Sequence, residues 1–389
     1  MRLDLPKPYP PGSLRIHSAT HVRADGRTLL FFAGSNYLGL TWHPALRRAM
    51  VSALKHGPLQ PNGSRATTGE HRAYRDLEAT IARFFGAEGA ALVTNGYAAP
   101  IAACQALRTE YSHVLLDQGA HACVADGARL SGKPVVRFDT GNDVDLQRRL
   151  ARLPAAARPL VATDGTFGVR GGVAPLDRYL AVLPKHGWLL VDDAHGGGTV
   201  GPGGRGAVAL FGLRDPRIVQ AFSLAKAFGV AGGAVVGTAE CAEAVRTKAS
   251  VFVGSTSMLI AAVVAAKAAV QLVAASPSRV RRLQANARLL HESLPAAPEI
   301  RSDPRTPATG VYPSSPAQAA ALRKSLLAAG ILPSWIRYLQ GPPGGFFRFA
   351  VCSEHTPFQV RQFAAAVRAG LGASPGGSET RPMRPMIVR

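Results

Sequence analysis

One lysine stands in a segment built almost entirely of small and apolar residues, FSLAKAFGVAGGAVVG at residues 222–237. The chain has 8 lysines against 37 arginines. Lysine, unlike arginine, can lose its proton and act as a nucleophilic amine. Low polarity around Lys226 would favour that reactive form. The residue is therefore a candidate for covalent chemistry, although a lysine at the exposed end of a strand or in a turn also fits the segment taken alone.

Two carboxylates and a histidine follow the apolar run in WLLVDDAHGGGTVG. Asp192 and Asp193 stand where the run ends, and His195 comes three residues after Asp192. A carboxylate buried at a strand end must be paired or hydrogen-bonded. A protonated heterocyclic nitrogen would be a suitable partner for it. The alternative is a carboxylate that caps the next turn.

A third strand end lies in LVTNGYAAPIAACQAL, where Asn95, Gly96 and Tyr97 open a predicted helix. Backbone N–H groups exposed at a helix start bind phosphate, and a glycine allows the phosphate to approach closely. The simpler interpretation is an ordinary helix cap made by Asn95.

Together, an amine, a carboxylate and a phosphate cradle at neighbouring strand ends match the needs of pyridoxal 5′-phosphate (PLP). The lysine forms the Schiff base, and the carboxylate keeps the pyridine nitrogen protonated, so that the ring can accept electrons. His121, in HVLLDQGAHA, follows another strand. Its imidazole could lie over the cofactor ring and handle protons, although alone it would read as a turn histidine.

The elements that must position these residues alternate between strands and helices from about residue 41 to residue 275. The predicted strands cover 89–95, 112–117, 134–139, 158–165, 187–193, 217–223 and 233–238. The predicted helices between them include 97–108, 120–131, 142–153 and 175–186. This alternation predicts an α/β fold with a mostly parallel, doubly wound sheet. Ligands bind at the carboxyl ends of such strands, which is where the polar residues lie.

The pattern changes after about residue 275. An amphipathic helix in SPSRVRRLQANARLLHESL is followed by a strand near TGVYP, a helix at 316–329, strands near ILPSWIRY and FFRFAVC, and a helix at about 357–371. We therefore expect an N-terminal segment, a large PLP-binding domain, a smaller α+β C-terminal domain and a flexible tail. Their predicted boundaries are 1–40, 41–275, 276–372 and 373–389.

Composition narrows the class of protein. The chain has 389 residues, of which 47% are apolar, and no apolar run is long enough to span a bilayer. The N-terminus lacks the apolar core of a signal peptide, and the four cysteines have no metal-ligand spacing. We therefore expect a cytoplasmic protein with no metal site. The formal charge of +21 could indicate a nucleic acid. However, the arginines are dispersed, and an anionic thioester substrate would also gain from a positive field.

Several longer motifs occur in one order between about residue 32 and residue 356. They are SNYLGL, NGSRATTGEHRAYRDLE, NGYAA, GAHA, TDGTFG, VDDAHGGGTVGPGGRG, SLAKAFGVAGG and GSTSM. With them the chain resembles the α-oxoamine synthases, which include 8-amino-7-oxononanoate synthase, 2-amino-3-ketobutyrate CoA ligase, 5-aminolevulinate synthase and serine palmitoyltransferase. The resemblance implies PLP-dependent transferase fold type I, with a seven-stranded sheet in the large domain.

The resemblance also assigns roles around the cofactor. Lys226 matches the Schiff-base lysine, Asp192 the partner of the ring nitrogen, His195 a contact of the ring oxygen, and His121 the residue stacked on the ring. The matches to phosphate or ring contacts include Asn95, Gly96, Tyr97, Asp164, Ser223 and Thr256.

Two further matches concern assembly and substrate. Thr256 matches a residue that reaches the phosphate from the partner subunit, which implies a homodimer with shared active sites. Arg348 matches the arginine that clamps the amino-acid carboxylate, and a guanidinium fork suits that planar anion. Asn36 matches an asparagine near the substrate.

The chain departs from the family at two motifs. Gly168-Val169-Arg170-Gly171 stands where the family commonly has Ser-Met-Asp-Gly, and Asp164 replaces a glutamate of the same motif. Tyr74 stands at the histidine position of a His-x-x-Leu-Glu motif. These changes fall near the expected substrate pocket.

The implied activity is a decarboxylative condensation of an α-amino acid with an acyl thioester, on coenzyme A or an acyl carrier protein, to give an α-aminoketone and CO₂. The alternatives are another fold-type I PLP enzyme, namely a C–C lyase or an aminotransferase, and a PLP-binding protein without turnover. We expect no nucleic acid and no membrane among its partners.

Overall fold

The computed structural model describes residues 8–10, 12–169, 171–338 and 341–372. The chain divides into a large unit, residues 40–167 and 173–277, and a small unit, residues 1–39, 168–172 and 278–389. The N-terminal segment thus belongs to the same unit as the C-terminal third of the chain. The predicted tail, 373–389, and Arg170 lie outside the described residues.

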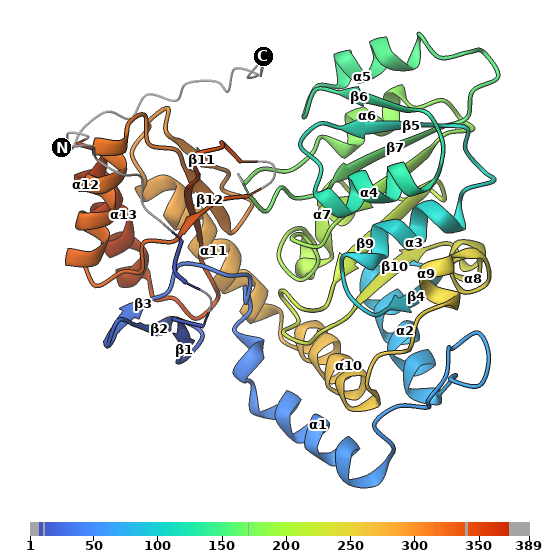
Figure 1. The fold of residues 1–389 in the computed structure, drawn as a ribbon, viewed down its shortest axis with the longest axis horizontal. Coiled ribbons are helices and arrows are strands. Elements are labelled where there is room, and N and C mark those ends of the chain that lie inside the picture. Colours follow the sequence, from blue (N-terminus) through green and yellow to red (C-terminus); the bar gives the residue numbers. More distant parts are fainter. Residues whose placement is uncertain (1–7, 11, 170, 339–340, 373–389) are drawn as a thin grey trace. The chain divides into compact units, whose positions relative to one another are not determined.

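The large unit is built on a seven-stranded sheet with the order β4-β10-β9-β8-β7-β5-β6. Its strands are β4 (Gly89–Val93), β5 (His113–Asp117), β6 (Val135–Phe138), β7 (Pro159–Asp164), β8 (Trp188–Asp192), β9 (Ile218–Ser223) and β10 (Gly233–Gly237). Only β10 pairs antiparallel with its neighbours; β9, β8, β7, β5 and β6 pair in parallel. The predicted mostly parallel, seven-stranded sheet is confirmed (Figure 1).

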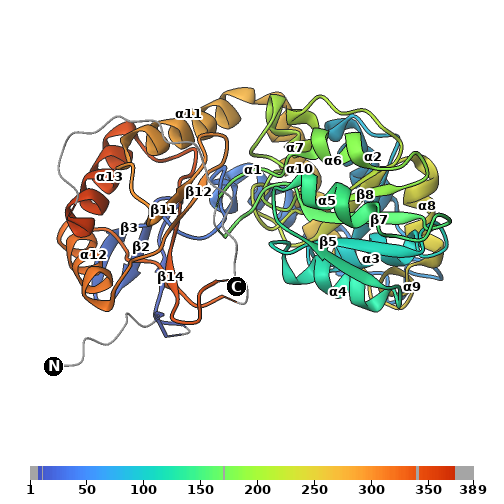
Figure 2. The same cartoon turned by 90° about the horizontal axis from the view of Figure 1, so that it is seen from above.

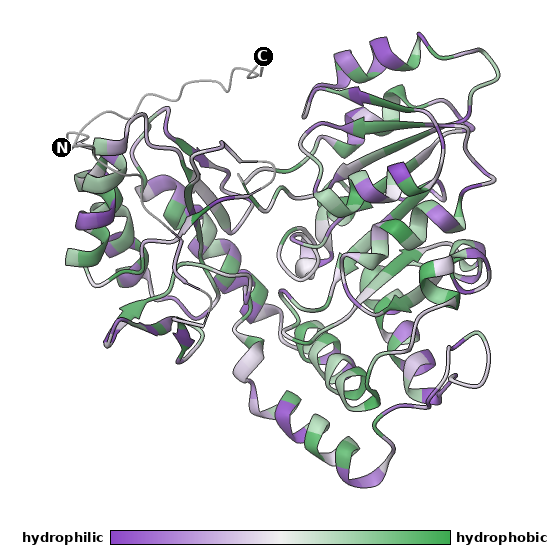
Figure 3. Ribbon diagram, in the orientation of Figure 1, coloured by the Kyte–Doolittle hydropathy of each residue, from purple (hydrophilic) through white to green (hydrophobic). Residues whose placement is uncertain are grey.

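Helices cover both faces of this sheet, as expected for parallel strands that read as continuous apolar runs. The helices of the large unit are α1 (Pro44–His56), α2 (Arg72–Phe85), α3 (Ala98–Ala106), α4 (Ala122–Leu130), α5 (Asp143–Leu150), α6 (Leu176–Val182), α7 (Gly206–Leu210), α8 (Ala239–Lys248), α9 (Ser250–Val253) and α10 (Ile260–Ala275). One hydrophobic cluster joins the sheet to α3, α4 and α8, and a second joins it to α5, α6 and α7. Figure 3 shows the central strands and α10 as mostly hydrophobic, whereas α5 is mixed.

The small unit contains two antiparallel sheets. Their strands are β1 (Arg15–Ile16), β2 (His21–Ala24) and β3 (Arg27–Leu30), and β11 (Ile300–Ser302), β12 (Ala308–Val311), β14 (Phe346–Ala350) and β13 (Trp335–Ile336). Its helices are α11 (Pro277–Ser293), α12 (Pro316–Ala328) and α13 (Pro357–Leu371). Helices α12 and α13 pack side by side (Figure 2). The predicted α+β character is confirmed; the β1–β3 sheet was not predicted.

Sequence signals explain where α13 begins and ends. Thr356 and Gln359 form a capping box at its start, Pro357 occupies the first turn, and Gly372 ends the helix in the left-handed conformation. Among the described residues, no single helix is long and apolar enough to cross a membrane. Helices α10 and α11 meet that criterion only when taken together, and the chain bends by 75° at the break between them.

Candidate active site

Strand alternation separates the two carboxylates that end β8. Leu190 packs into the cluster with α3 and α4, whereas Val191 packs into the cluster on the opposite face of the sheet. Side chains two residues apart share a face. Asp192 therefore faces α4 and Asp193 faces α7, so these neighbours in the sequence lie in different surroundings.

Asp192 is held by two hydrogen bonds on the α4 face. Its Oδ1 accepts from the backbone N–H of Ala194 at 3.0 Å, and its Oδ2 accepts from the Cys123 thiol at 3.0 Å. The residue is only 4% exposed. Its carboxylate is thus fixed in orientation by one backbone group and one side chain.

His121 joins the same cluster from the start of α4. It is the N-cap of that helix, and its Nδ1 accepts from the backbone N–H of Cys123 at 3.2 Å. The Cys123 Sγ lies 2.9 Å from the same nitrogen. Burial lowers the pKa of His121, and the positive charge of Lys226 lowers it further, although Asp192 opposes the shift. The imidazole is therefore neutral near pH 7.

Asp164 brings a second buried carboxylate to this face. It pairs in register with Asp192 on the neighbouring parallel strand, and its Oδ1 accepts from the backbone N–H of His121 at 2.9 Å. Burial raises the pKa of Asp164 well above its usual range, and the charge of Asp192 adds to the shift. Lys226 lowers the same pKa, which shows that this lysine is close enough to influence the cluster.

Lys226 lies in the turn that follows β9. Its backbone carbonyl accepts from the N–H of Gly229 at 3.1 Å, and the flanking Ala227 and Phe228 are fully buried. The lysine itself is half-buried. Within the large unit, Lys226 therefore lies in the neighbourhood of His121 and Asp164, whose pKa values its charge lowers.

The residues of the predicted phosphate cradle lie where the loop after β4 meets the end of β9. A Cβ added to Gly96 would lie 2.5 Å from the Cβ of Ser223, so only glycine fits. The Ser223 hydroxyl accepts from the N–H of Ala225 at 3.2 Å. Asn95 caps α3 through its side-chain oxygen, which accepts from the N–H of Ala98 at 2.9 Å. The cap interpretation and the cradle interpretation thus coexist.

Tyr97 and His195 border this group. The Tyr97 hydroxyl donates to Asp126 of α4, and its ring meets the ring of His121 edge-on with centroids 6.0 Å apart. His195 is half-buried, and its carbonyl accepts from the Thr199 hydroxyl at 2.6 Å.

Thr256 lies in a different part of the large unit. It forms an isolated β-bridge with Ser64 and lines a small cavity together with Thr94, Arg65 and Tyr74. Its side chain is exposed. Exposure is what a residue that contacts a second subunit requires.

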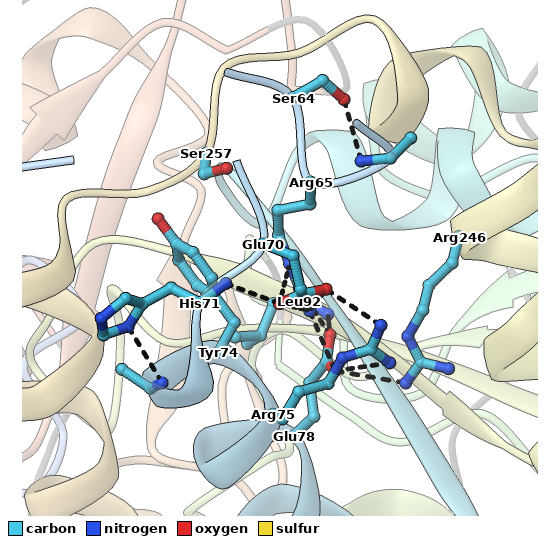
Figure 4. A network of polar contacts seen from close by, with 12 residues as sticks. Ser64, Arg65, Glu70, His71, Tyr74, Arg75, Glu78, Leu92, Arg246 and Ser257 are labelled. Carbon is cyan, nitrogen blue, oxygen red and sulfur yellow. Dashed lines mark hydrogen bonds and ion pairs between the residues drawn. The ribbon is translucent and has the colours of Figure 1, made fainter. Parts of the chain in front are cut away.

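An ion network lies next to this cavity (Figure 4). Glu78 accepts from Arg65 at 2.6 Å, from Arg246 at 3.2 Å and from the N–H of Leu92 at 2.9 Å. The Arg65 guanidinium also lies 4.7 Å from the centre of the Tyr74 ring. Tyr74, which departs from the family motif, thus packs against this network.

The Tyr74 hydroxyl has its own partner, because it donates to the carbonyl of Met258 at 2.6 Å. The tyrosine therefore ties α2 to the segment that leads from Thr256 into α10. The departure at this position has a structural role in the chain.

Arg348 and Asn36 belong to the small unit. Arg348 Nε donates to the carbonyl of Gly168 at 2.6 Å, Nη1 to the carbonyl of Gly34 at 3.0 Å, and Nη2 to the hydroxyl of Tyr37 at 3.2 Å. Phe347 and Phe349 flank it, fully buried, while Arg348 is half-buried.

Asn36 lines a small cavity of the small unit with Gly34, Tyr37 and His355. Since Gly34 and Tyr37 also contact Arg348, the two predicted substrate residues share neighbours. In the remaining departure, Gly168-Val169-Arg170-Gly171, Gly168 contributes the carbonyl that accepts from Arg348.

The donor set suits PLP. A buried carboxylate can hold the protonated ring nitrogen, a lysine amine is near it, and Gly96 packs against Ser223 at the start of α3, where a phosphate would meet a helix N-terminus. Among the described residues, His121, Cys123 and Asp192 are also the one group of ligand atoms close enough to share a metal ion. The surrounding lysine and cradle favour the organic cofactor.

Comparison with known proteins gives the family. The model for aminotransferases of class I and II matches residues 27–367. An 8-amino-7-oxononanoate synthase of Aromatoleum aromaticum is 34% identical over 360 residues, covering 91% of this chain and 92% of the relative. Serine palmitoyltransferase of Sphingomonas paucimobilis is 31% identical, covering 91% and 86%.

Solved structures agree with these relatives. A serine palmitoyltransferase from S. paucimobilis, solved with bound PLP–myriocin aldimine, superposes with a TM-score of 0.86 at 30% identity, covering 94% of each chain. The chain therefore belongs to the class I and II aminotransferase family, which are PLP enzymes of fold type I. Within that family it is an α-oxoamine synthase. The predicted resemblance, fold and cofactor are confirmed.

The main residue that the sequence prediction missed is Cys123. It was counted only among four scattered cysteines, yet its thiol contacts both His121 and Asp192. The available signal was its position two residues after His121 in GAHACVADG. That spacing places it in the first turn of the helix that His121 caps.

Proposed function

We propose that this enzyme catalyses the decarboxylative condensation of an α-amino acid with an acyl thioester. The products are an α-aminoketone, CO₂ and the free thiol of coenzyme A or an acyl carrier protein. The observation that carries the proposal is the grouping of Lys226, Asp192 and His121 on one face of the sheet, in a chain of α-oxoamine synthase type.

PLP supplies the electron sink that stabilises negative charge at the amino acid's Cα. Lys226 would hold the cofactor covalently and, once released by the amino acid, take the proton from Cα through its Nζ. Asp192 would keep the ring nitrogen protonated. His121, neutral because of burial, would lie over the ring and donate from Nε2.

The phosphate would lie against the backbone of Gly96 and Tyr97 and the hydroxyl of Ser223. Asp164 and His195 complete the polar surroundings of the ring. Asn95 fixes the cradle by capping α3.

Arg348 would clamp the amino acid's carboxylate, with Asn36 beside it. A guanidinium has five N–H donors, and the bonds to Gly168, Gly34 and Tyr37 use three of them. Two N–H groups are left for a bidentate contact with an anion.

A homodimer with shared sites is part of the proposal. Thr256 would reach the phosphate of the second subunit. Large exposed apolar side chains near its segment, Leu59 and Leu259, would be covered in such an assembly. A main chain hydrogen bond of 3.0 Å from Ile260 to Leu59 joins the two segments. Four free, buried cysteines suit the cytoplasm.

The test is a panel of amino acids and acyl thioesters offered to the PLP-loaded enzyme. The expected result is equimolar release of free thiol and CO₂ with an active pair. Amino-acid cleavage without a thioester would identify a C–C lyase. Accumulation of pyridoxamine phosphate would identify an aminotransferase. Either result would contradict the proposed reaction.

A further inference from the structure

Cys123 lies between two residues of the proposed site. Its Sγ is 3.0 Å from Oδ2 of Asp192 and 2.9 Å from Nδ1 of His121, and the residue is 2% exposed. Burial and the charge of Asp192 both raise the pKa of the Cys123 thiol. The group therefore keeps its proton and is a hydrogen-bond donor.

The thiol has a single proton, and the local bonds indicate where it goes. Nδ1 of His121 already accepts from the backbone N–H of Cys123, as part of the cap of α4. A neutral imidazole that accepts at Nδ1 has its proton on Nε2. The thiol proton then points to the carboxylate of Asp192.

We propose that Cys123 is a positioning residue for Asp192. Its S–H···Oδ2 bond, together with the N–H of Ala194 on Oδ1, holds the carboxylate in the orientation that meets the ring nitrogen of PLP. The inference rests on the proposed function, because it requires that PLP binds with its nitrogen at Asp192. Each carboxylate oxygen has a second lone pair left for that contact.

The neighbouring acidic residues do not fix the orientation of the Asp192 carboxylate, which leaves this role to the Cys123 thiol. Asp164 bonds the backbone of His121 rather than Asp192. Asp193 is turned to the opposite face, where it accepts from Gln220. Without the thiol proton, the carboxylate keeps, among the hydrogen bonds of the described residues, the one from the N–H of Ala194, and its orientation toward the ring nitrogen is less restrained.

The experiment compares two cofactors, PLP and its 1-deaza analogue, in which the ring nitrogen is replaced by a C–H. Dissociation constants are measured by equilibrium dialysis with the full-length apoenzyme. The proteins are wild type, Cys123→Val, which is apolar and lacks a donor, and Cys123→Ser, which keeps a donor. Cys241→Val is the control, since Cys241 is an equally buried thiol whose pKa is raised by burial alone.

The expected result is a loss of about fivefold in PLP affinity for Cys123→Val, the usual net effect of losing one hydrogen bond. Affinity for the deaza analogue should change less than about twofold, because the lost bond acts only through the ring nitrogen. Cys123→Ser should retain the affinity of the wild type for PLP. Cys241→Val should affect both cofactors equally or not at all.

Equal losses for both cofactors in Cys123→Val would overturn the inference and leave a packing role. Failure of Cys123→Ser to restore PLP affinity would overturn it too. If Cys123→Val is unstable, Cys123→Ala gives the same test, because the measured quantity is the difference between the affinities of one variant for the two cofactors. A wild type that binds no PLP would refute the proposed function, whereas normal PLP binding with equal losses refutes only the positioning role.

Discussion

Two buried groups of charges in the large unit follow opposite rules. At Glu78, one carboxylate meets the guanidinium groups of Arg65 and Arg246 and a backbone N–H, so that every buried charge is opposed (Figure 4). At the ends of β7 and β8, Asp164 and Asp192 lie next to each other on neighbouring parallel strands. Burial raises the pKa of Asp164, and the negative charge of Asp192 raises it further.

This difference between the two groups helps to distinguish buried charges that stabilise the fold from buried charges that bind a ligand. A network of paired charges gains little from any further ligand, and breaking it leaves an unpaired charge. A pair of like charges costs stability until a cation relieves it, and in the proposed site a protonated pyridine ring together with Lys226 would supply that cation. We therefore expect substitutions at the two places to affect different measurements.

The largest effect should follow Lys226→Ala, which removes the covalent anchor and the base at Cα. Turnover should fall by roughly 10³-fold or more. Borohydride reduction and peptide mapping should place the cofactor label on Lys226 in the wild type and find none in the variant. The control is Lys267→Ala, since Lys267 is held at 2.9 Å by Asp76 in an ion pair. A label on another lysine would contradict the assignment.

Glu78→Gln should break the network of paired charges around Arg65 and Arg246. Arg65 would lose its shortest ion pair in a buried position, so the free energy of unfolding should fall by about 3–5 kcal/mol. The measurement is urea unfolding of the apoprotein, with cofactor affinity as the second readout. Glu243→Gln is the control, because Glu243 is an exposed partner of Arg246 and should contribute less than about 1 kcal/mol. An unchanged midpoint for Glu78→Gln would show that the network is dispensable.

Asp192→Asn should not lower the urea midpoint of the apoprotein, because it removes one of two neighbouring like charges. It should lower turnover on the order of 10²-fold, because the ring nitrogen loses its charged partner. Asp193→Asn is the matched comparison one residue away, and its turnover should stay within about threefold of wild type. The measurement that distinguishes the two variants is the turnover number from steady-state kinetics with PLP-saturated enzymes. The reverse order of effects would assign the ring contact to Asp193.

Asp193 also predicts a pH dependence of stability. Burial raises the pKa of Asp193 to about 7, from 3.8 in the unfolded chain. A folded pKa above the unfolded one gives stability that is complete below pH 3.8 and is lost as the pH rises through about 7. Relative to Asp193→Asn, the wild type should therefore lose about 2 kcal/mol between pH 5 and pH 7. Parallel stability curves would mean that Asp193 stays ionised.

The sequence predicted the central sheet well, because strands buried on both faces read as continuous apolar runs. The same strands placed Asp192, His121 and Lys226 at one edge. The β1–β3 sheet was missed because its strands are two to four residues long and carry exposed arginines, as in HVRA and RTLL. Such segments have no clear period.

Contacts that depend on which strand lies beside which were harder to predict. The pairing of Asp164 with Asp192 follows from the strand order, which the alternating pattern does not specify. The proposed role of Cys123 requires the first turn of α4 to lie beside the end of β8, which the sequence pattern does not show, so the thiol looked like that of an ordinary buried cysteine. The family motif also gave no reason for Tyr74, which becomes clear only from its contacts with Arg65 and Met258.

Arg348, in the small unit, extends the comparison of paired and unpaired charges. Its half-buried guanidinium is bonded to carbonyls and a hydroxyl rather than to a carboxylate. If the missing anion is the substrate's carboxylate, Arg348→Lys should weaken amino-acid binding about tenfold, because an ammonium cannot form the planar fork. The KM for the thioester should change less than about threefold. The measurement is a spectroscopic titration of the PLP-loaded enzyme with the amino acid.

The control for that titration is Arg305→Lys. Arg305 makes a bidentate fork in the same unit, at 2.9 Å and 2.6 Å from the two oxygens of Asp303, so its charge is already satisfied within the chain. Its replacement should lower stability without changing amino-acid affinity. Equal amino-acid affinities in wild type and Arg348→Lys would mean that the carbonyls of Gly34 and Gly168 already complete the environment of Arg348. The carboxylate clamp would then have to be sought on another residue.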